Sequence, residues 1–326
     1  MKMVVVALFR VLVTMALCSS STLVVAQEWP TRAVKLVVPY PPGGGVDLFA
    51  RALAQKLQQQ WQQSVTVDNK PGANTLIGTE AVARSNDGHT LLFTTDATFT
   101  INPLLYSKLP YELDKDFAPI VQLVSFSQLL VANSALPANS LPELISLAKN
   151  KPASLSYASY GAGSQPQLAM ETLKQKAGIY ILHIPYRGIP QAIAAVVGGE
   201  VPLTWSGIPS ARPHIASKRI KALAYGGKTR SPAFPDVPTV AELGFAEIDA
   251  NVWVGLFGTS TMAATAIAKA QRDVTTILQE PEFRAREIDA KGHDLVAAGP
   301  VEFRRHIRNE LASRAAPIRY SGAKAD

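Results

Sequence analysis

The chain has 326 residues, 47% of them apolar and 17% charged, which is enough material for a core and about two domains of average size. This composition excludes a chain that is mainly disordered. The formal net charge of +7 is scattered along the chain, apart from a group of arginines near the C-terminus. Because this group has no interleaved aromatic residues and no nucleic-acid motif accompanies it, it favours a solvated helix face over nucleic-acid binding. The arginines of this group are Arg304, Arg305, Arg308, Arg314 and Arg319.

Residues 1–26 have the pattern of a secretory signal peptide. Lys2 and Arg10 precede or flank an apolar run, and small residues then lead to Ala26, after which cleavage is predicted. A retained anchor is disfavoured because the apolar run is short for a span of about 20 residues. A lipoprotein anchor is disfavoured because a bulky leucine precedes Cys18, the only cysteine of the chain. The mature chain is therefore expected to be soluble, to lack disulfides and to carry a charge of +5, since two of the seven net positive charges leave with the signal.

From residue 34 onward, apolar β-rich runs alternate with amphipathic helical stretches, which predicts an α/β protein with largely parallel sheets. In chain order, the predicted elements are a strand at 34–39, a helix at 48–61, a strand at 65–67, a helix at 75–85, and strands at 91–95 and 120–132. They continue as a helix at 141–150, a strand at 154–158, a helix at 166–177, a strand at 181–183, a helix at 190–197, strands at 203–205, 222–225 and 252–258, and two C-terminal helices.

The long strands at 120–132 and 252–258 are the natural places for the chain to cross between two lobes. One lobe is thus expected from both ends of the mature chain and the other from its middle. The predicted boundaries are 27–125 and 245–326 for the first lobe, and 126–244 for the second.

A glycine-rich loop follows the first predicted strand and opens the first helix. Its sequence from Tyr40 to Asp47 contains three consecutive glycines, which let backbone amides converge at a helix start that carries partial positive charge. This predicts an anion seat. Asp47 is predicted to be the N-cap of the helix, and because its carboxylate repels an anion, amides or an ordered water are expected to make the direct contact. The alternative is a tight turn without a ligand.

A second loop, at residues 157–166, repeats this arrangement in the other half of the chain. Gly161 and Gly163 lie between a strand and a helix, together with the hydroxyls of Ser159 and Ser164. One such loop is weak evidence, but two of them suggest a cleft that clamps a ligand from both sides. Valine in place of Gly44 or Gly163 is expected to fill the seat without unfolding a lobe.

Several enzyme and metal motifs fail at the positions that carry their mechanism. Pro166 occupies the place of the third glycine of a dinucleotide fingerprint, and Ala222 that of the first glycine of a P-loop. The five histidines are far apart, so neither a metal site nor a cofactor is predicted. His183 is predicted to be a satisfied core histidine, while Trp205 and Trp253 either line a pocket or pack in the core.

A series of motifs resembles the solute-binding receptors of tripartite tricarboxylate transporters, the Bug family. The motifs run in order along nearly the whole mature chain: Tyr-Pro-Pro-Gly-Gly-Gly-Val-Asp at 40–47, Asn-Lys-Pro-Gly-Ala at 69–73, Asp-Gly-His-Thr-Leu-Leu at 87–92, Lys-Asp-Phe-Ala-Pro at 115–119, Pro-Tyr-Arg-Gly at 185–188 and Asp-Val-Pro-Thr-Val at 236–240. The resemblance implies a periplasmic binding protein of type II, a Venus flytrap of two α/β lobes that is not an enzyme. It also implies that both glycine loops pinch one ligand carboxylate, with ordered waters, and that the ligand passes to a membrane permease.

The chain departs from the family pattern at places that bear on specificity. Gln167 stands where the family usually has histidine, and Ser206 and Gly207 stand where it commonly has an Asp-Asn pair. The lost negative charge disfavours a ligand amine, so a carboxylate without an amino group is expected. Residues 74–76 also replace a glycine-rich loop. Asp96 is expected either to contact the distal part of the ligand or to cap a local turn.

The sequence thus predicts a monomeric carboxylate receptor that binds no nucleic acid. One alternative is an exported serine hydrolase of small esters or amides that uses Ser159, Ser164 or Ser206, although the sequence shows no base near them. The other is a binding protein that feeds a sensor. The predicted ligand-binding residues are Tyr40, Pro42, Gly43, Gly44, Asp47, Thr95, Asp96, Ser159, Gly161, Gly163, Ser164, Gln165, Gln167, Tyr186 and Ser206.

Overall fold

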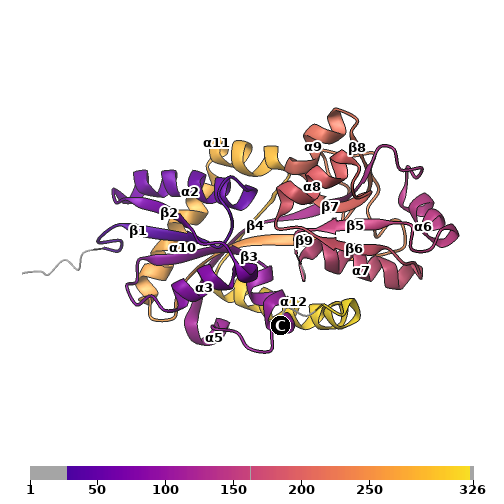
Figure 1. Ribbon diagram of the computed structural model, residues 1–326. Helices are drawn as coiled ribbons and strands as arrows, with labels where there is room; N and C mark the ends of the chain where they lie inside the picture. Colours follow the sequence, from indigo (N-terminus) through magenta and orange to yellow (C-terminus); the bar gives the residue numbers. More distant parts are fainter. Residues whose placement is uncertain (1–27, 162, 324–326) are drawn as a thin grey trace, which may run out of the picture.

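The computed structural model describes residues 28–161 and 163–323, so the predicted signal peptide, with Cys18, lies outside the described residues. These residues form two α/β lobes joined through strands β4 and β9, which run through the middle of the molecule (Figure 1). Within the described ranges, no helix combines the length and the apolar character needed to cross a membrane.

The first lobe is built from both ends of the chain. Its parallel strands are β1 (Val34–Val38), β2 (Val65–Asn69) and β3 (Thr90–Thr95), with β1 in the centre. Parallel neighbours need a crossover connection, and here it is supplied by helices α2 (Gly45–Trp61) and α3 (Leu76–Ala83). The antiparallel strands are β9 (Asn251–Thr259), which pairs with β3, the first half of β4 (Phe117–Asn133), and β10 (Asp294–Ala298).

The second lobe comes from the middle of the chain. Strand β5 (Ser156–Ser159) lies parallel to β6 (Leu182–Pro185) and to β7 (Leu203–Gly207). The second half of β4 is antiparallel to β7 and to β8 (Ile220–Tyr225). The helices of this lobe are α6 (Leu141–Asn150), α7 (Gln165–Ala177), α8 (Ile189–Gly198) and α9 (Ile208–Ala216).

Strand β4 connects the lobes by changing partners along its length. It pairs with β9 as far as Ser127 and with β7 from Gln128 onward. The expectation of largely parallel sheets is therefore wrong for the crossing strands, because β4 runs antiparallel to its partners in both lobes and β9 runs antiparallel to β3 and β4. The change of partner lies close to the lobe boundary predicted after residue 125, and the boundaries themselves stay predictions.

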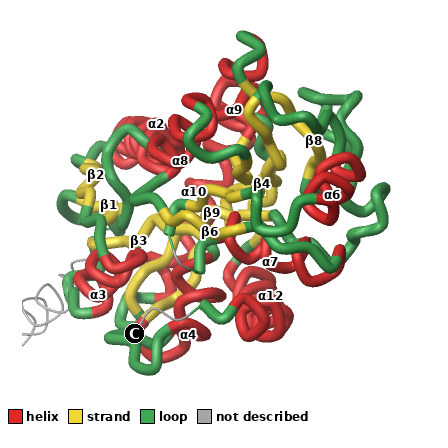
Figure 2. Tube along the Cα trace, turned by 45° about the vertical axis from the view of Figure 1, so that its right-hand side comes forward, coloured by secondary structure: helices red, strands yellow, loops and turns green. Residues whose placement is uncertain are grey.

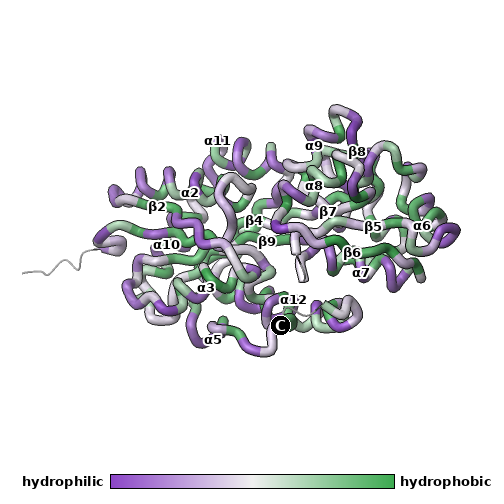
Figure 3. Tube along the Cα trace, viewed as in Figure 1, coloured by the Kyte–Doolittle hydropathy of each residue, from purple (hydrophilic) through white to green (hydrophobic). Residues whose placement is uncertain are grey.

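Each lobe has its own apolar core. Hydrophobic residues follow the central strands, and hydrophilic residues mark the outer helices (Figure 3). Trp253, 2% exposed, packs with Phe257 and Phe303 in the first lobe, and Trp205, 1% exposed, packs with Tyr157 in the second. Both tryptophans are thus core residues.

The remaining helical segments surround the first lobe, and the last of them continues to the second. Helix α12 begins on the first lobe and ends beside α7 (Figures 1 and 2). The segments are η1 (Ala73–Thr75), η2 (Ala97–Ile101), α4 (Asn102–Leu105), α5 (Leu113–Asp116), α10 (Ala264–Gln279), α11 (Pro281–Phe283), η3 (Arg284–Ile288), η4 (Asp289–Lys291) and α12 (Pro300–Ser321).

Candidate ligand-binding site

The first glycine loop joins β1 to α2. Gly43 has a φ of +83°, in the left-handed region that favours glycine, and Gly44 is the N-cap of the helix. Asp47 is consequently the third residue of the helix, and its prediction as N-cap is wrong. Because the glycines allow the helix to begin at Gly45, Asp47 reaches back from the first turn and accepts a hydrogen bond from the Gly43 amide at 2.8 Å.

Asp47 holds this loop from within. Its side chain is 1% exposed, and it also accepts hydrogen bonds from Arg51 Nε at 3.0 Å and from Asn69 Nδ2 at 2.9 Å. Burial alone raises the pKa of Asp47. The hydrogen bonds from Arg51, Gly43 and Asn69 together lower it by more than burial raises it, so the pKa of Asp47 lies below its usual value. Asn69 Nδ2 also donates to the carbonyl of Tyr40 at 3.1 Å, which ties down the start of the loop.

The second glycine loop, between β5 and α7, has the same construction. Ser164 is the N-cap, Gly163 has a φ of +72°, and Gln167 is the third residue of the helix. The Gly163 amide donates to Gln167 Oε1 at 2.6 Å. In both loops, a glycine with left-handed backbone therefore donates to a side chain four residues further on. The amides at the beginning of each helix have no acceptor within the helix and are suited to bind an anion; in α7, Pro166 contributes none.

The serine hydroxyls of the second loop point into the loop instead of away from it. Ser164 Oγ donates to the Gly161 carbonyl at 2.6 Å, and Ser159 Oγ accepts from the Gly161 amide at 3.1 Å. Ligand binding by these hydroxyls stays a prediction, and in this structure both are engaged within the loop. Backbone amides are the groups that both loops offer.

His183 lies beside Ser159, with Nε2 at 2.6 Å from the serine Oγ. The expectation that no base lies near Ser159 is therefore wrong: parallel pairing of β5 with β6 brings together residues that are 24 positions apart. His183 is hydrogen-bonded, as predicted, and stacks on Tyr157, but it is only half-buried. Burial lowers the pKa of His183 and favours its neutral form. Since Ser159 is 0% exposed and also contacts Gly161, the pair supports the loop.

The two lobes touch beside the second loop. A Cβ atom built on Gly163 would lie 1.9 Å from Cδ1 of Leu105, which belongs to the first lobe. Leu105 also packs with Leu168 of α7 and with Ile318 of α12. The expectation that valine at Gly163 simply fills the seat is thus wrong, because a side chain there collides with the opposite lobe.

Each glycine loop carries a tyrosine that is hydrogen-bonded to a polar residue beside it. Tyr40, which opens the first loop, shares a hydrogen bond with Thr95 Oγ1 at 2.8 Å. Tyr160, which precedes Gly161, accepts a hydrogen bond from Gln128 Nε2 at 3.2 Å. Burial and the charge of Asp96 raise the pKa of Tyr160, so this side chain of the second lobe lies within electrostatic range of the first. Neither Tyr160 nor Gln128 was predicted as a site residue.

The other predicted residues are placed around these loops. Asp96 makes no cap hydrogen bond to the turn that follows β3, so that alternative is wrong; it is 2% exposed and forms an ion pair with Arg314. Pro42 is exposed in the first loop. In the second lobe, Tyr186 lies beside Ser159, to whose carbonyl its amide donates, and Ser206 Oγ faces the carbonyl of the next residue, Gly207.

The model of the tripartite tricarboxylate transporter receptor family matches residues 49–322. The chain belongs to this family. Among its relatives, Protein BugT of Bordetella pertussis is 34% identical over 301 residues, which cover 92% of each chain. Among the described residues of this receptor, no group of three or more histidine, aspartate or glutamate side chains is arranged to hold a metal ion.

Solved structures of similar proteins share the fold of the receptor. The periplasmic binding protein BugD is 28% identical, with a TM-score of 0.82 over 91% of this chain and 99% of that one. Rpa4515 of R. palustris, solved with adipate, is also 28% identical, with a TM-score of 0.85 over 91% and 99%. MatC of Rhodopseudomonas palustris, solved with malate, is 27% identical, with a TM-score of 0.81 over 89% and 100%. The predicted two-lobed binding-protein fold is confirmed.

Replacing Asp47 with alanine is expected to lower the free energy of unfolding by about 1–3 kcal/mol at pH 7, because three hydrogen-bond donors lose a charged, buried acceptor. Since the pKa of Asp47 is lowered in the folded state, its ionic contribution is fully present above the unfolded pKa near 4 and disappears as the pH falls through the folded value. Urea unfolding of both proteins at pH 7 and at pH 3 measures this difference, which should shrink at pH 3. Asp47→Asn, which keeps an acceptor oxygen, should fall between the two, and equal stabilities at pH 7 would contradict this role.

Proposed function

We propose that this receptor captures a small organic carboxylate between its lobes outside the cytoplasm and delivers it to the permease subunits of a tripartite tricarboxylate transporter. The observation that carries the proposal is the pair of glycine loops, one in each lobe, built alike and held by Asp47 and Gln167. Membership of the receptor family and the adipate and malate complexes of similar proteins support it. The receptor binds and releases its ligand without catalysing a reaction.

Helix termini alone do not account for such binding. Each helix start contributes about 0.3–1 kcal/mol to anion binding, whereas micromolar affinity requires about 8 kcal/mol. Charge-assisted hydrogen bonds from the loop amides, together with closure of the lobes and exclusion of water, supply the remainder. The ligand therefore binds tightly only when both loops reach it.

The distal part of the ligand is proposed to lack an amino group. Ser206 and Gly207 end strand β7 without a negative charge, in the positions where the family pattern commonly has an acid. Malate and aspartate are a suitable pair for a test, because they differ only in a hydroxyl and an ammonium group. The receptor should prefer the member without the ammonium group.

A thermal-shift screen tests the proposed function. Adipate, malate, aspartate, and a panel of aliphatic and aromatic mono- and dicarboxylates are added to the purified receptor. A ligand at 100 times its dissociation constant stabilises the folded state by about 2.7 kcal/mol, so at least one carboxylate should raise the melting temperature in a concentration-dependent way. A panel without any such shift would contradict the proposal, and a larger shift with aspartate than with malate would contradict the proposed specificity.

Export through the N-terminal signal peptide is part of the proposal. The intact mass of protein released from cells by osmotic shock should correspond to a chain that begins at Gln27. Native mass spectrometry of the same sample should show a monomer. Capture of membrane proteins with the ligand-loaded receptor should recover permease subunits; recovery of a sensor kinase instead would favour the alternative partner.

A further inference from the structure

Helix α12 packs on both lobes. Near its beginning, Phe303 and Ile307 are buried against Trp253 and Phe257 of the first lobe. Near its end, Ile318 packs between α4 of the first lobe and α7 of the second. In addition to strands β4 and β9, helix α12 is thus a third element that connects the lobes.

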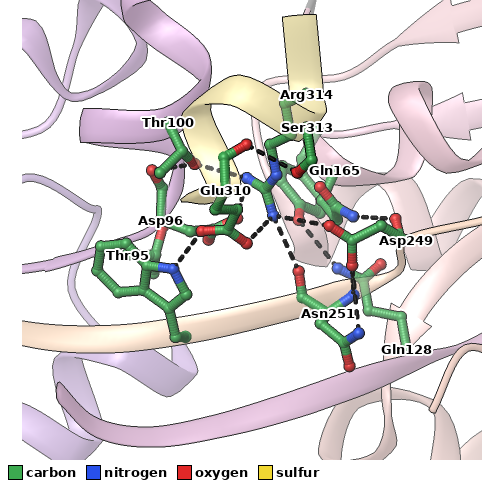
Figure 4. Close-up of polar contacts among 12 residues, drawn as sticks. Thr95, Asp96, Thr100, Gln128, Gln165, Asp249, Asn251, Glu310, Ser313 and Arg314 are labelled. Carbon is green, nitrogen blue, oxygen red and sulfur yellow. Dashed lines mark hydrogen bonds and ion pairs between the residues drawn. The ribbon is translucent and has the colours of Figure 1, made fainter. Parts of the chain in front are cut away.

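A buried arginine lies on α12 between these two packed regions. Arg314 is 3% exposed, and its guanidinium faces three carboxylates, those of Asp96, Asp249 and Glu310 (Figure 4). Nη1 donates to Asp96 Oδ2 at 2.5 Å and Nη2 donates to Glu310 Oε1 at 2.7 Å. Nη2 also lies 3.3 Å from Asp249 Oδ2, just before strand β9 returns to the first lobe. A single side chain therefore gathers groups from three separate parts of the chain.

One branch of this network leads to the first glycine loop. Asp96, the partner of Nη1, is adjacent in sequence to Thr95 at the end of β3. Thr95 Oγ1 shares a hydrogen bond with the hydroxyl of Tyr40, the residue that opens the first loop. Nη1 also donates to Thr100 Oγ1 at 2.8 Å, which fixes the turn after β3 against the helix.

The other branch leads to the second glycine loop. The backbone carbonyl of Asp249 accepts a hydrogen bond from Gln165 Nε2. Gln165 is the first residue of α7, directly after the N-cap Ser164, and it is 3% exposed. Arg314 is thus linked through Asp249 and Gln165 to the helix start that forms the second half of the anion seat.

We infer that Arg314 is a positioning residue of the ligand site, which fixes the two glycine loops relative to each other through the Asp96–Thr95–Tyr40 branch and the Asp249–Gln165 branch. A fixed separation matters because the seat is assembled from amides of both lobes, and a small displacement of one half loses several hydrogen bonds at once. This inference rests on the proposed function, because it concerns the site at which the ligand is proposed to bind. Its test, however, is made without ligand and does not depend on which acid binds.

Hydrogen exchange of the ligand-free receptor is the primary test. The amides of Gly43 and Gly163 are both hydrogen-bonded, and peptides that contain them report on the two loops. In Arg314→Lys, which keeps the charge but loses the planar fork of donors, both peptides should exchange about tenfold faster, a typical size for coupling through a network. Arg308→Lys is the matched control, since Arg308 lies on the same helix with its side chain 62% exposed, and it should leave both loops unchanged.

Two further variants separate the branches. Asp249→Asn keeps one acceptor oxygen but removes the charge that faces Arg314, and it should accelerate exchange at Gly163 more than at Gly43. Thr95→Val removes the hydroxyl that binds Tyr40 and should act mainly on Gly43. If Arg314→Lys does not fold, these two variants decide the matter. Unchanged exchange in both loops of the folded variants, or acceleration confined to the amides of α12, would overturn the inference.

Ligand affinity gives an independent readout. With adipate or malate as the probe, whichever raises the melting temperature more, the dissociation constant should rise about tenfold in Arg314→Lys, chiefly through faster dissociation. It should be unchanged in Arg308→Lys. An Arg314→Lys receptor that releases the probe at the wild-type rate would overturn the inference, whereas absence of binding in the wild type would contradict the proposed function and leave the exchange test standing.

Discussion

Gly44→Val is expected to weaken carboxylate binding by about 100-fold or more while the receptor stays folded. Gly44 has an ordinary φ of −76°, and the nearest atom to a Cβ built there is the carbonyl oxygen of Pro41, at 3.7 Å. The isopropyl group therefore enters open space before the first amides of α2 without straining the backbone. Loss of two charge-assisted hydrogen bonds, at about 1.5–3 kcal/mol each, gives an effect of this size.

Isothermal titration calorimetry with the carboxylate selected by the thermal-shift screen measures this effect. Gly198→Val is a matched control, because a Cβ at Gly198 meets nothing within 4 Å and the residue ends α8, outside both glycine loops. Circular dichroism should show similar melting temperatures for the ligand-free wild type and Gly44→Val. Unchanged affinity in Gly44→Val would show that the first loop does not bind the acid group.

Gly163→Ala is expected to weaken binding by about tenfold or more for a different reason. Its Cβ collides with Leu105 of the first lobe, so the two lobes cannot approach as closely as they do in this structure. The φ of +72° adds backbone strain of about 1 kcal/mol in any non-glycine residue. Leu105→Ala in the same chain removes most of the collision and should restore part of the affinity, although the strain remains.

Small-angle X-ray scattering of the ligand-loaded proteins distinguishes the effect on closure from the effect on folding. Gly163→Ala should have a larger radius of gyration than wild type at saturating ligand, and the double variant with Leu105→Ala should return toward the wild-type value. Single and double variants that bind equally weakly, with wild-type dimensions, would show that Leu105 is not the cause.

Much of the fold follows from local signals in the sequence. The helix predicted at 141–150 is α6, which begins with Leu141 and Pro142 after the N-cap Ser140 and ends at the predicted residue. Both glycine loops were predicted because each follows an apolar strand and precedes a helix. Their internal support was not predicted, because the pairing of a glycine amide with a side chain four residues on depends on where each helix begins.

These local signals do not predict contacts between segments that are distant in the sequence. Strand β10 was missed because it is short and lies partly exposed at the edge of the pairing with β4. Ala73, Asn74 and Thr75 all have positive φ, a conformation that asparagine favours but alanine and threonine do not, so three such residues in a row are not predicted by propensity. The side chain of Asn102, 28 positions from Asn74, exchanges hydrogen bonds with it and holds this backbone in place.

The prediction of a solvated helix face holds for some of the C-terminal arginines and is wrong for one of them. Arg305, Arg308 and Arg319 are exposed, in agreement with a solvated helix face, but Arg314 is buried. Arg314 shares a helix face with the buried residues Phe303, Ile307 and Ile318, at helical spacings of 11, 7 and 4. The position of a charged residue within an apolar stripe therefore indicates that its side chain is buried and forms an ion pair.

Each loop is held by a side chain of its own helix. In the proposed mode of binding, main-chain amides contact the acid group, so its recognition does not depend on which side chains line the rest of the interlobe space. Residues farther along that space can be substituted while the two glycine loops stay intact. In the proposed mode of binding, substitutions in that space are expected to change which organic acid is bound while binding of the shared carboxylate is retained.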